Sequence, residues 1–162
     1  ILVIGKTIGH LEQSIFARNI LSEKKGPPPE VNLFNEKNNG LTTLKLIKEN
    51  LIESCHDVSL GGIIVAISKM CLKGKKGIKI NQLKGLINKF EYFFGEDQAR
   101  YLVEIQKENL PKVDKILKEN SVHYDELGTV VDENIEFSDE IKLSIDDLEK
   151  SYKSWLRKYM IN

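Results

Sequence analysis

The sequence lacks the features that define several large classes of protein. Its two cysteines, Cys55 and Cys71, have no CxxC spacing, so they supply neither a disulfide framework nor a zinc site. No apolar run approaches the roughly 18 residues of a membrane-spanning helix, and no signal-peptide pattern opens the chain. The 24 basic and 24 acidic side chains cancel, which removes the general electrostatic argument for binding nucleic acid or an anionic membrane. We therefore expect a cytoplasmic protein without nucleic-acid or membrane partners.

What remains is the composition of an ordinary globular chain. Of its 162 residues, 41% are hydrophobic and 30% are charged, which is enough apolar material to bury a core. We expect residues 1–162 to form a single domain. The chain starts with isoleucine, and Ile1–Ile4 already has the continuous apolar character of a strand covered on both faces. We expect this domain to be a fragment of a longer polypeptide.

Alternating strand-like and helix-like segments predict an α/β (α+β) fold with a mixed sheet flanked by helices. Strands are expected over residues 1–4, 52–57, 78–80, 99–105 and 122–131, with a small hairpin over 135–143. Helices are expected after the caps Asn32 and Asn109, over 63–71 and 83–90, and from Ser144 onward. The helix after Asn32 has an apolar stripe, which predicts a buried face formed by Leu41, Leu44, Ile47 and Leu51.

The segment His56–Gly62 places a carboxylate, a hydroxyl and two glycines at the end of a predicted strand. Glycines let a backbone approach a ligand closely, and the N–H groups at the start of a helix favour an anion. Asp57 could hold Mg²⁺, which takes one or two protein carboxylates when it bridges phosphates. Alternatively, Asp57 or Ser59 caps the helix while the glycines allow tight packing.

A second polar segment, Phe94–Gln98, brings two acids and an amide together just before a predicted strand. Glu96 and Gln98 could bind a polar ligand or a hydrated cation. Acidic residues and glycine are also common in turns, so a turn without a ligand is the alternative.

Taken together, the two segments resemble the C-terminal domain of the family that includes aminoimidazole ribonucleotide synthetase, selenophosphate synthetase and thiamine monophosphate kinase. The family pattern His-Asp-x-Ser-x-Gly-Gly stands at residues 56–62, followed by an apolar helix. The pattern Phe-Gly-Glu-Ser-Gln-x-Arg stands at residues 94–100, with Asp97 in the place of serine. Weaker matches occur in the same order as in the family, at residues 4–14, 27–31 and 127–130 and at Trp155.

The resemblance implies a fold that is partly ferredoxin-like and an activity in purine biosynthesis. The most similar members are ATP-dependent carbon–nitrogen ligases that convert an amide into an amidine, with Mg²⁺ and with ammonia drawn from glutamine. Their partners would be the preceding domains of the same chain, a glutaminase subunit or domain, and the small-molecule substrate. The resemblance therefore implies that residues 1–162 are the C-terminal fragment of a longer multidomain enzyme. In this family the catalytic histidine and most nucleotide contacts lie in the preceding domains, so an isolated fragment is expected to be inactive.

The resemblance also assigns roles to residues of this chain. It implies a phosphate- or nucleotide-facing loop formed by Asp57, Ser59, Gly61 and Gly62, with Asp57 also a candidate for Mg²⁺. Glu96 and Gln98 are weaker ligand candidates, and no residue is expected to be catalytic. The extra negative charge of Asp97 would disfavour an anionic ligand at this loop unless a cation intervened.

Two other classes of function stay open at this stage. One is a non-catalytic domain whose patterns serve only folding and docking. The other is a self-contained ferredoxin-like module that binds a ligand.

Overall fold

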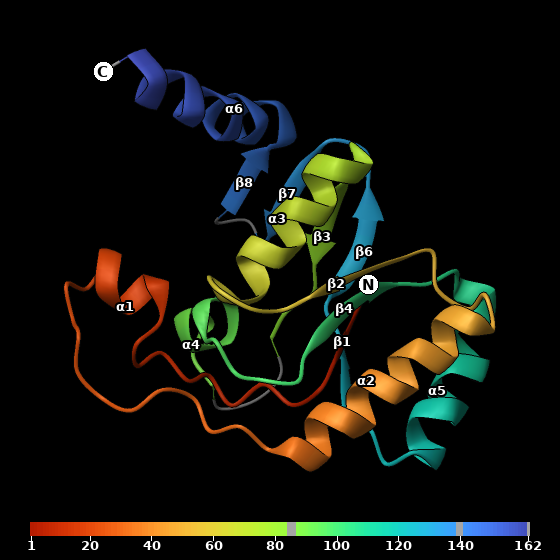
Figure 1. Ribbon diagram of the computed structural model, residues 1–162. Coiled ribbons are helices and arrows are strands. Elements are labelled where there is room, and N and C mark those ends of the chain that lie inside the picture. Colours follow the sequence, from red (N-terminus) through yellow and green to blue (C-terminus); the bar gives the residue numbers. More distant parts are fainter. Residues whose placement is uncertain (84–86, 139–140, 162) are drawn as a thin grey trace. The chain divides into compact units, whose positions relative to one another are not determined.

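The computed structural model describes residues 1–83, 87–138 and 141–161 (Figure 1), and it divides into two compact units. The first unit comprises Ile1–Ile67 and Leu83–Leu127, and the second Ser68–Gln82 and Gly128–Asn162. Each unit contains a four-stranded sheet. The predicted α/β class with helices and mixed strand directions is confirmed, with the strands divided between two sheets.

The sheet of the first unit has the strand order β2-β4-β1-β5, and its neighbouring strands are all antiparallel. Its strands are β1 (Leu2–Ile4), β2 (Ser54–Asp57), β4 (Tyr101–Glu104) and β5 (Tyr124–Glu126). Helix α2 (Leu33–Lys48) connects β1 to β2, and α5 (Leu110–Glu119) connects β4 to β5. This β-α-β-β-α-β order with its strand arrangement is ferredoxin-like, as predicted, with a long insertion between β2 and β4.

Short helices occupy the connections of the first unit. They are α1 (Ile15–Asn19), α4 (Lys89–Phe94) and the 3₁₀ turn η1 (Lys107–Asn109). A helix is expected over 83–90, and in the described residues α4 begins at Lys89, where Asn88 and Glu91 form a capping box. Leu86, part of the predicted helix, lies outside the described residues.

The core of the first unit lies between its sheet and the helices α2 and α5. Strand β1 is central in the sheet, and its three residues are buried, in agreement with the apolar run at Ile1–Ile4. Across the sheet, Leu2 pairs with Val103, and Ile4 pairs with Tyr101 and Tyr124. The helices complete the cluster with Leu46, Val113, Ile116 and Leu117.

Helix α2 presents a different face to the core from the one predicted. Leu41, Leu44 and Ile47 are exposed, whereas the buried residues of the helix are Asn39, Thr42, Thr43 and Leu46. Leu51, the fourth residue of the predicted stripe, follows the end of the helix and is buried in the core, as predicted. The orientation follows from two contacts beneath the helix. The Asn39 side-chain amide donates to the Ala99 carbonyl at 2.8 Å, and Gly40 faces the Tyr101 hydroxyl, which lies 3.2 Å from where a Cβ would be. The hydrogen bond of Asn39 and the close approach at Gly40 therefore decide which face of α2 is buried, and not the apolar stripe.

The sheet of the second unit has the order β6-β3-β7-β8 and is mixed, because β3 and β7 are parallel. Its strands are β3 (Gly77–Ile80), β6 (Gly128–Val131), β7 (Asn134–Phe137) and β8 (Ile141–Ser144). Helix α6 (Ile145–Ile161) follows β8, and α3 (Gly62–Gly74) runs from the first unit into the second. Strands β7 and β8 form the predicted hairpin.

The strand expected over 122–131 is two strands, β5 and β6, which belong to different sheets. The change occurs at Gly128, where a Cβ would lie 2.3 Å from the Lys79 carbonyl oxygen of β3. Only glycine permits this approach of two backbones. Within the part of the chain that the structure describes, no helix has the length and apolar character to cross a bilayer.

The orientation of α2 gives a direct test by truncation of two leucines on the same helix. Leu46 is 0% exposed and Leu44 is 42% exposed. We expect Leu46→Ala to lower the free energy of unfolding by about 2–5 kcal/mol, because it removes core contacts and leaves a cavity. Leu44→Ala should cost about 1 kcal/mol or less. Urea denaturation of both variants measures the difference, and equal losses would contradict the observed orientation.

Candidate functional site

Two loops of the first unit meet at the candidate site. One follows β1 and contains residues 5–14, and the other joins α4 to β4 and contains residues 95–100. Gly5 has φ +94°, and a Cβ there would lie 2.4 Å from the Ala99 carbonyl oxygen, so the two loops pack backbone against backbone.

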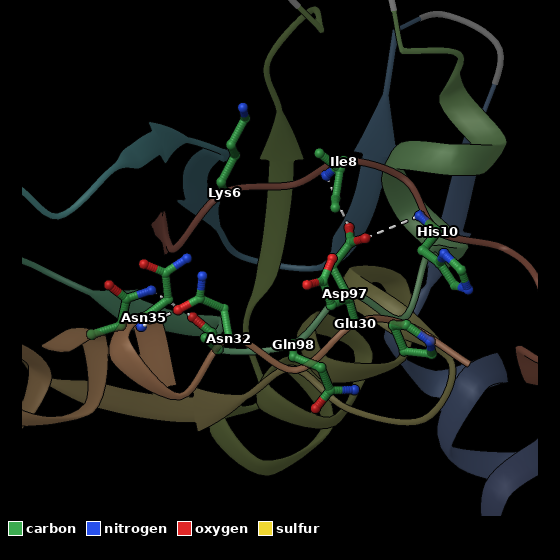
Figure 2. A pocket seen from close by; sticks show the side chains of 11 residues that line it. Lys6, Ile8, His10, Glu30, Asn32, Asn35, Asp97 and Gln98 are labelled. Carbon is green, nitrogen blue, oxygen red and sulfur yellow. Dashed lines mark hydrogen bonds between the residues drawn. The ribbon is translucent and has the colours of Figure 1, made fainter. Parts of the chain in front are cut away.

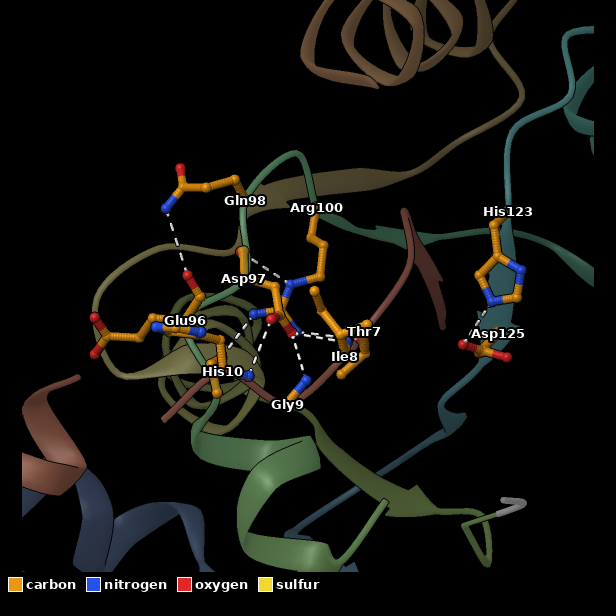
Figure 3. A network of polar contacts seen from close by, with 11 residues as sticks. Thr7, Ile8, Gly9, His10, Glu96, Asp97, Gln98, Arg100, His123 and Asp125 are labelled. Atoms are coloured by element: carbon orange, nitrogen blue, oxygen red, sulfur yellow. Dashed lines mark hydrogen bonds and ion pairs between the residues drawn. The ribbon is translucent and has the colours of Figure 1, made fainter. Parts of the chain in front are cut away.

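The carboxylate of Asp97 is the centre of this contact (Figure 3). It accepts three hydrogen bonds from consecutive backbone N–H groups, with N···O distances of 3.0, 2.9 and 3.0 Å from Ile8, Gly9 and His10. The residue is only 3% exposed. A carboxylate from one loop thus fixes the backbone of the other.

Arg100 forms an ion pair with this buried carboxylate. Its Nη1 lies 3.5 Å from Asp97 Oδ2, and the whole residue is 1% exposed. The guanidinium also donates to the carbonyl oxygens of Asp97 and Gly95 and to the Thr7 hydroxyl. Burial lowers the pKa of Arg100, while the negative charge of Asp97 acts in the opposite direction. The pair is therefore buried, hydrogen-bonded and compensated.

The carboxylate of Glu96 also binds backbone N–H groups, from two other segments. Its Oε1 accepts from the backbone N–H groups of Ile15 and Gly61, both at 2.8 Å, and its own N–H donates to the His10 carbonyl. The residue is buried. Glu96 thereby joins the first turn of α1, the turn before α3 and the loop after β1.

A pocket of about 220 Å³ opens beside these two loops (Figure 2). Four side-chain amides line it, from Asn32, Asn35, Asn39 and Gln98, together with Lys6, His10 and Glu30. Asp97 and Ala99 also line it, and Ala99 adopts the left-handed conformation with φ +58°. The lining can donate and accept many hydrogen bonds, so it suits a small polar ligand.

The structure brings only some of the predicted site residues together. Gly61 and Glu96 are in direct contact through the 2.8 Å hydrogen bond, and Gln98 lines the pocket next to Asp97. Asp57 stands at the end of β2 with a side chain 66% exposed, and Ser59 is also exposed. Neither of these two residues belongs to the lining of the pocket.

The glycines of the predicted loop make internal contacts. The Gly61 N–H is bound by Glu96, and the Gly62 N–H donates to the Ser59 carbonyl at 3.0 Å. Gly62 has φ +70°, and a Cβ there would lie 2.5 Å from the Phe93 carbonyl oxygen. Tight packing of the start of α3 against residues 93–95 thus requires a glycine here, which matches the alternative considered from the sequence.

The described residues contain few side chains placed to bind a metal ion. No group of three or more His, Cys, Asp and Glu side chains in these residues is arranged to hold an ion. Asp57 has a carboxylate open to solvent, with His56 Nδ1 at 3.4 Å from its Oδ1. One exposed carboxylate fits a hydrated Mg²⁺ that takes its other ligands from water and phosphate.

Sequence reasoning missed the Asp97–Arg100 pair, because it treated Asp97 as a charge facing the ligand. One signal was available: this lysine-rich chain has only three arginines, and Arg100 is one of them. Arginine is preferred over lysine where a buried cation must serve several acceptors at once.

The comparison with family models identifies the class of this protein. The model described as "AIR synthase related protein, C-terminal domain" matches residues 1–139. The chain belongs to this family, and the resemblance noted from the sequence is confirmed.

Two relatives that match the chain over its whole length are PurL subunits. The chain is 63% identical over all its 162 residues to phosphoribosylformylglycinamidine synthase subunit PurL of Pelagibacter ubique (strain HTCC1062). It is 36% identical over 162 residues to the PurL subunit of Bartonella bacilliformis. In both cases the chain spans 22% of the length of the relative.

Solved structures show the same fold. The structure of T. maritima PurL complexed with FGAR matches 91% of this chain and 27% of its own, with a TM-score of 0.75 and 21% identity. The hydrogenase maturation protein HypE matches 89% of this chain and 51% of its own, with a TM-score of 0.55 and 11% identity.

The internal role of Glu96 can be tested against that of its neighbour Gln98. Glu96→Ala would leave the buried N–H of Gly61 and the N–H of Ile15 without their acceptor. We expect a loss of about 2–4 kcal/mol in the free energy of unfolding. Gln98 is exposed and makes one hydrogen bond of 3.4 Å, so Gln98→Ala should cost about 0.5 kcal/mol or less. Chemical denaturation of the two variants is the measurement, and a Glu96→Ala variant as stable as Gln98→Ala would refute the role.

Proposed function

We propose that this chain is the C-terminal domain of a PurL-type phosphoribosylformylglycinamidine synthase and forms a single domain within a longer, multidomain subunit. The observation that carries the proposal is the 63% identity with a PurL subunit over the whole chain, which spans 22% of that relative. The reaction joins formylglycinamide ribonucleotide and ammonia at the expense of ATP. Its products are formylglycinamidine ribonucleotide, ADP and phosphate.

The chemistry requires an amide oxygen to become a leaving group. ATP transfers its γ-phosphoryl group to that oxygen, and ammonia then attacks the amide carbon and displaces phosphate. Mg²⁺ would supply charge neutralisation during the phosphoryl transfer. The ammonia comes from glutamine through a glutaminase subunit or domain, and one T. maritima structure bears the name PurLQS, an assembly that includes PurL.

The share of this chain in that reaction is to position a ligand rather than to react with it. Asp57 and Ser59 present an exposed carboxylate and hydroxyl at the end of β2, suited to a hydrated Mg²⁺ and a phosphate. Gly61 and Gly62 shape the turn that displays them, and the amide-lined pocket containing Gln98 lies on the same unit. No side chain here is proposed to be catalytic, and the enzyme is proposed to work in the cytoplasm.

The first experiment measures ATP hydrolysis by the full-length protein with and without formylglycinamide ribonucleotide and ammonium. Hydrolysis that requires both is the expected result. The isolated 162-residue chain should hydrolyse no ATP, because the nucleotide contacts lie in other domains. If the full-length protein hydrolyses ATP at the same rate with and without formylglycinamide ribonucleotide and ammonium, the proposed reaction is refuted.

The contribution of Asp57 is tested by a charge-removing variant in the same full-length protein. We expect Asp57→Asn to raise the Mg²⁺ concentration needed for half-maximal activity about tenfold, since one ligand to the hydrated ion becomes neutral. Asp132→Asn is the matched control, because Asp132 is also exposed and lies in the other unit. An Asp57→Asn enzyme with unchanged Mg²⁺ dependence would limit the chain to a structural role.

That structural role is the second candidate function. It is favoured by one observation: backbone N–H groups suited to an anion are already bound by Glu96 and Asp97 of the chain itself. In this case the chain supports the folding and docking of a larger enzyme, and both candidates predict the same overall reaction.

A further inference from the structure

The three N–H groups around Asp97 have the geometry of an anion-binding site. Ile8 and Gly9 donate to Oδ2 and His10 donates to Oδ1, so both carboxylate oxygens are bound by consecutive residues. Gly9 has φ +82°, and a left-handed residue within such a run turns successive N–H groups toward a common point. Backbone concavities of this kind bind phosphate and other anions in many proteins.

Arg100 gives this concavity a full positive charge. Its Nη1 lies 3.5 Å from Asp97 Oδ2. The same Nη1 also donates to the Thr7 hydroxyl at 3.2 Å, while Nη2 donates to the Gly95 carbonyl oxygen at 2.6 Å and Nε to the backbone carbonyl oxygen of Asp97 at 3.1 Å. The guanidinium therefore has anchors that remain when the carboxylate is removed.

The neighbouring carboxylate provides a contrast. Glu96 accepts from two N–H groups that belong to distant segments, Ile15 and Gly61, and no ion pair with a cation is found for it among the described residues. Among the described residues, Asp97 is the carboxylate that combines three consecutive backbone donors with a buried guanidinium. Asp97 also lines the pocket, together with Lys6, His10 and Glu30 (Figure 2).

We infer that Ile8, Gly9, His10 and Arg100 form a binding site for a small oxyanion, phosphate or carboxylate, which the Asp97 side chain fills as a built-in ligand. The site is consequently closed to a free phosphate in this chain. Replacing Asp97 with serine, the residue of the family pattern, removes the tethered anion and opens the site to one from solution. The inference concerns this loop alone and does not depend on the proposed reaction.

The experiment compares Asp97→Ser with the unaltered chain in inorganic phosphate and in sodium chloride of equal ionic strength. The expected result is a lower thermal midpoint for Asp97→Ser in chloride and a gain of about 5 °C in phosphate, as specific binding to the folded state produces. The unaltered chain should gain less than about 1 °C. Isothermal titration should detect one phosphate per molecule of the variant only.

Asp114→Ser is the control for loss of a carboxylate elsewhere. Asp114 accepts hydrogen bonds from the Tyr124 hydroxyl and from Lys118, and no run of backbone donors to it is found in the described part of the chain. This variant should gain no more from phosphate than the unaltered chain. If Asp97→Ser is poorly folded in chloride, its refolding yield in phosphate replaces the thermal midpoint, and a restored yield supports the site.

Three results would overturn the inference. One is an Asp97→Ser variant that responds to phosphate no more than Asp114→Ser does. Another is a refolding yield that phosphate leaves unchanged. The third is stoichiometric binding of phosphate to the unaltered chain with the affinity of the variant, because the Asp97 carboxylate would then not be the occupant of the site.

Discussion

The ion pair between Asp97 and Arg100 is the interaction on which the loops of the first unit depend. Both side chains are almost fully buried, and a lone buried charge costs several kcal/mol unless a partner and hydrogen bonds compensate it. Here the carboxylate has three backbone donors, and the guanidinium has a hydroxyl and two carbonyl oxygens in addition. The pair is satisfied only while the loop after β1 lies against the loop before β4.

This constraint explains the other features of the site. Gly5 must allow the Ala99 carbonyl to approach, and Ala99 adopts a left-handed conformation where the chain turns toward β4. The Ala99 carbonyl in turn accepts from Asn39, which fixes the rotation of α2 about its axis. A polar network beneath the helix thus decides which of its residues face solvent, and the apolar residues Leu41, Leu44 and Ile47 remain outside.

The same network limits what the chain can offer a ligand. Glu96 and Asp97 bind the backbone N–H groups that an anion would otherwise use. The groups that can still contact a ligand are side chains. Asp57 and Ser59 are exposed at the end of β2, and amides line the pocket beside residues 97–99. The chain spans 22% of the length of its PurL relatives.

The sequence by itself determined the family, the α/β class, the buried strand at Leu2–Ile4 and the helix cap at Asn32, because these depend on local patterns of residue type. Tertiary structure decided the division into two sheets at Gly128, the outward face of α2 and the burial of Asp97. Each of these depends on a contact between segments far apart in the chain, such as Gly128 with Lys79 or Asp97 with Ile8. No local pattern reveals such a partner, since the energy of a buried charge or a close backbone approach is set by what lies opposite it.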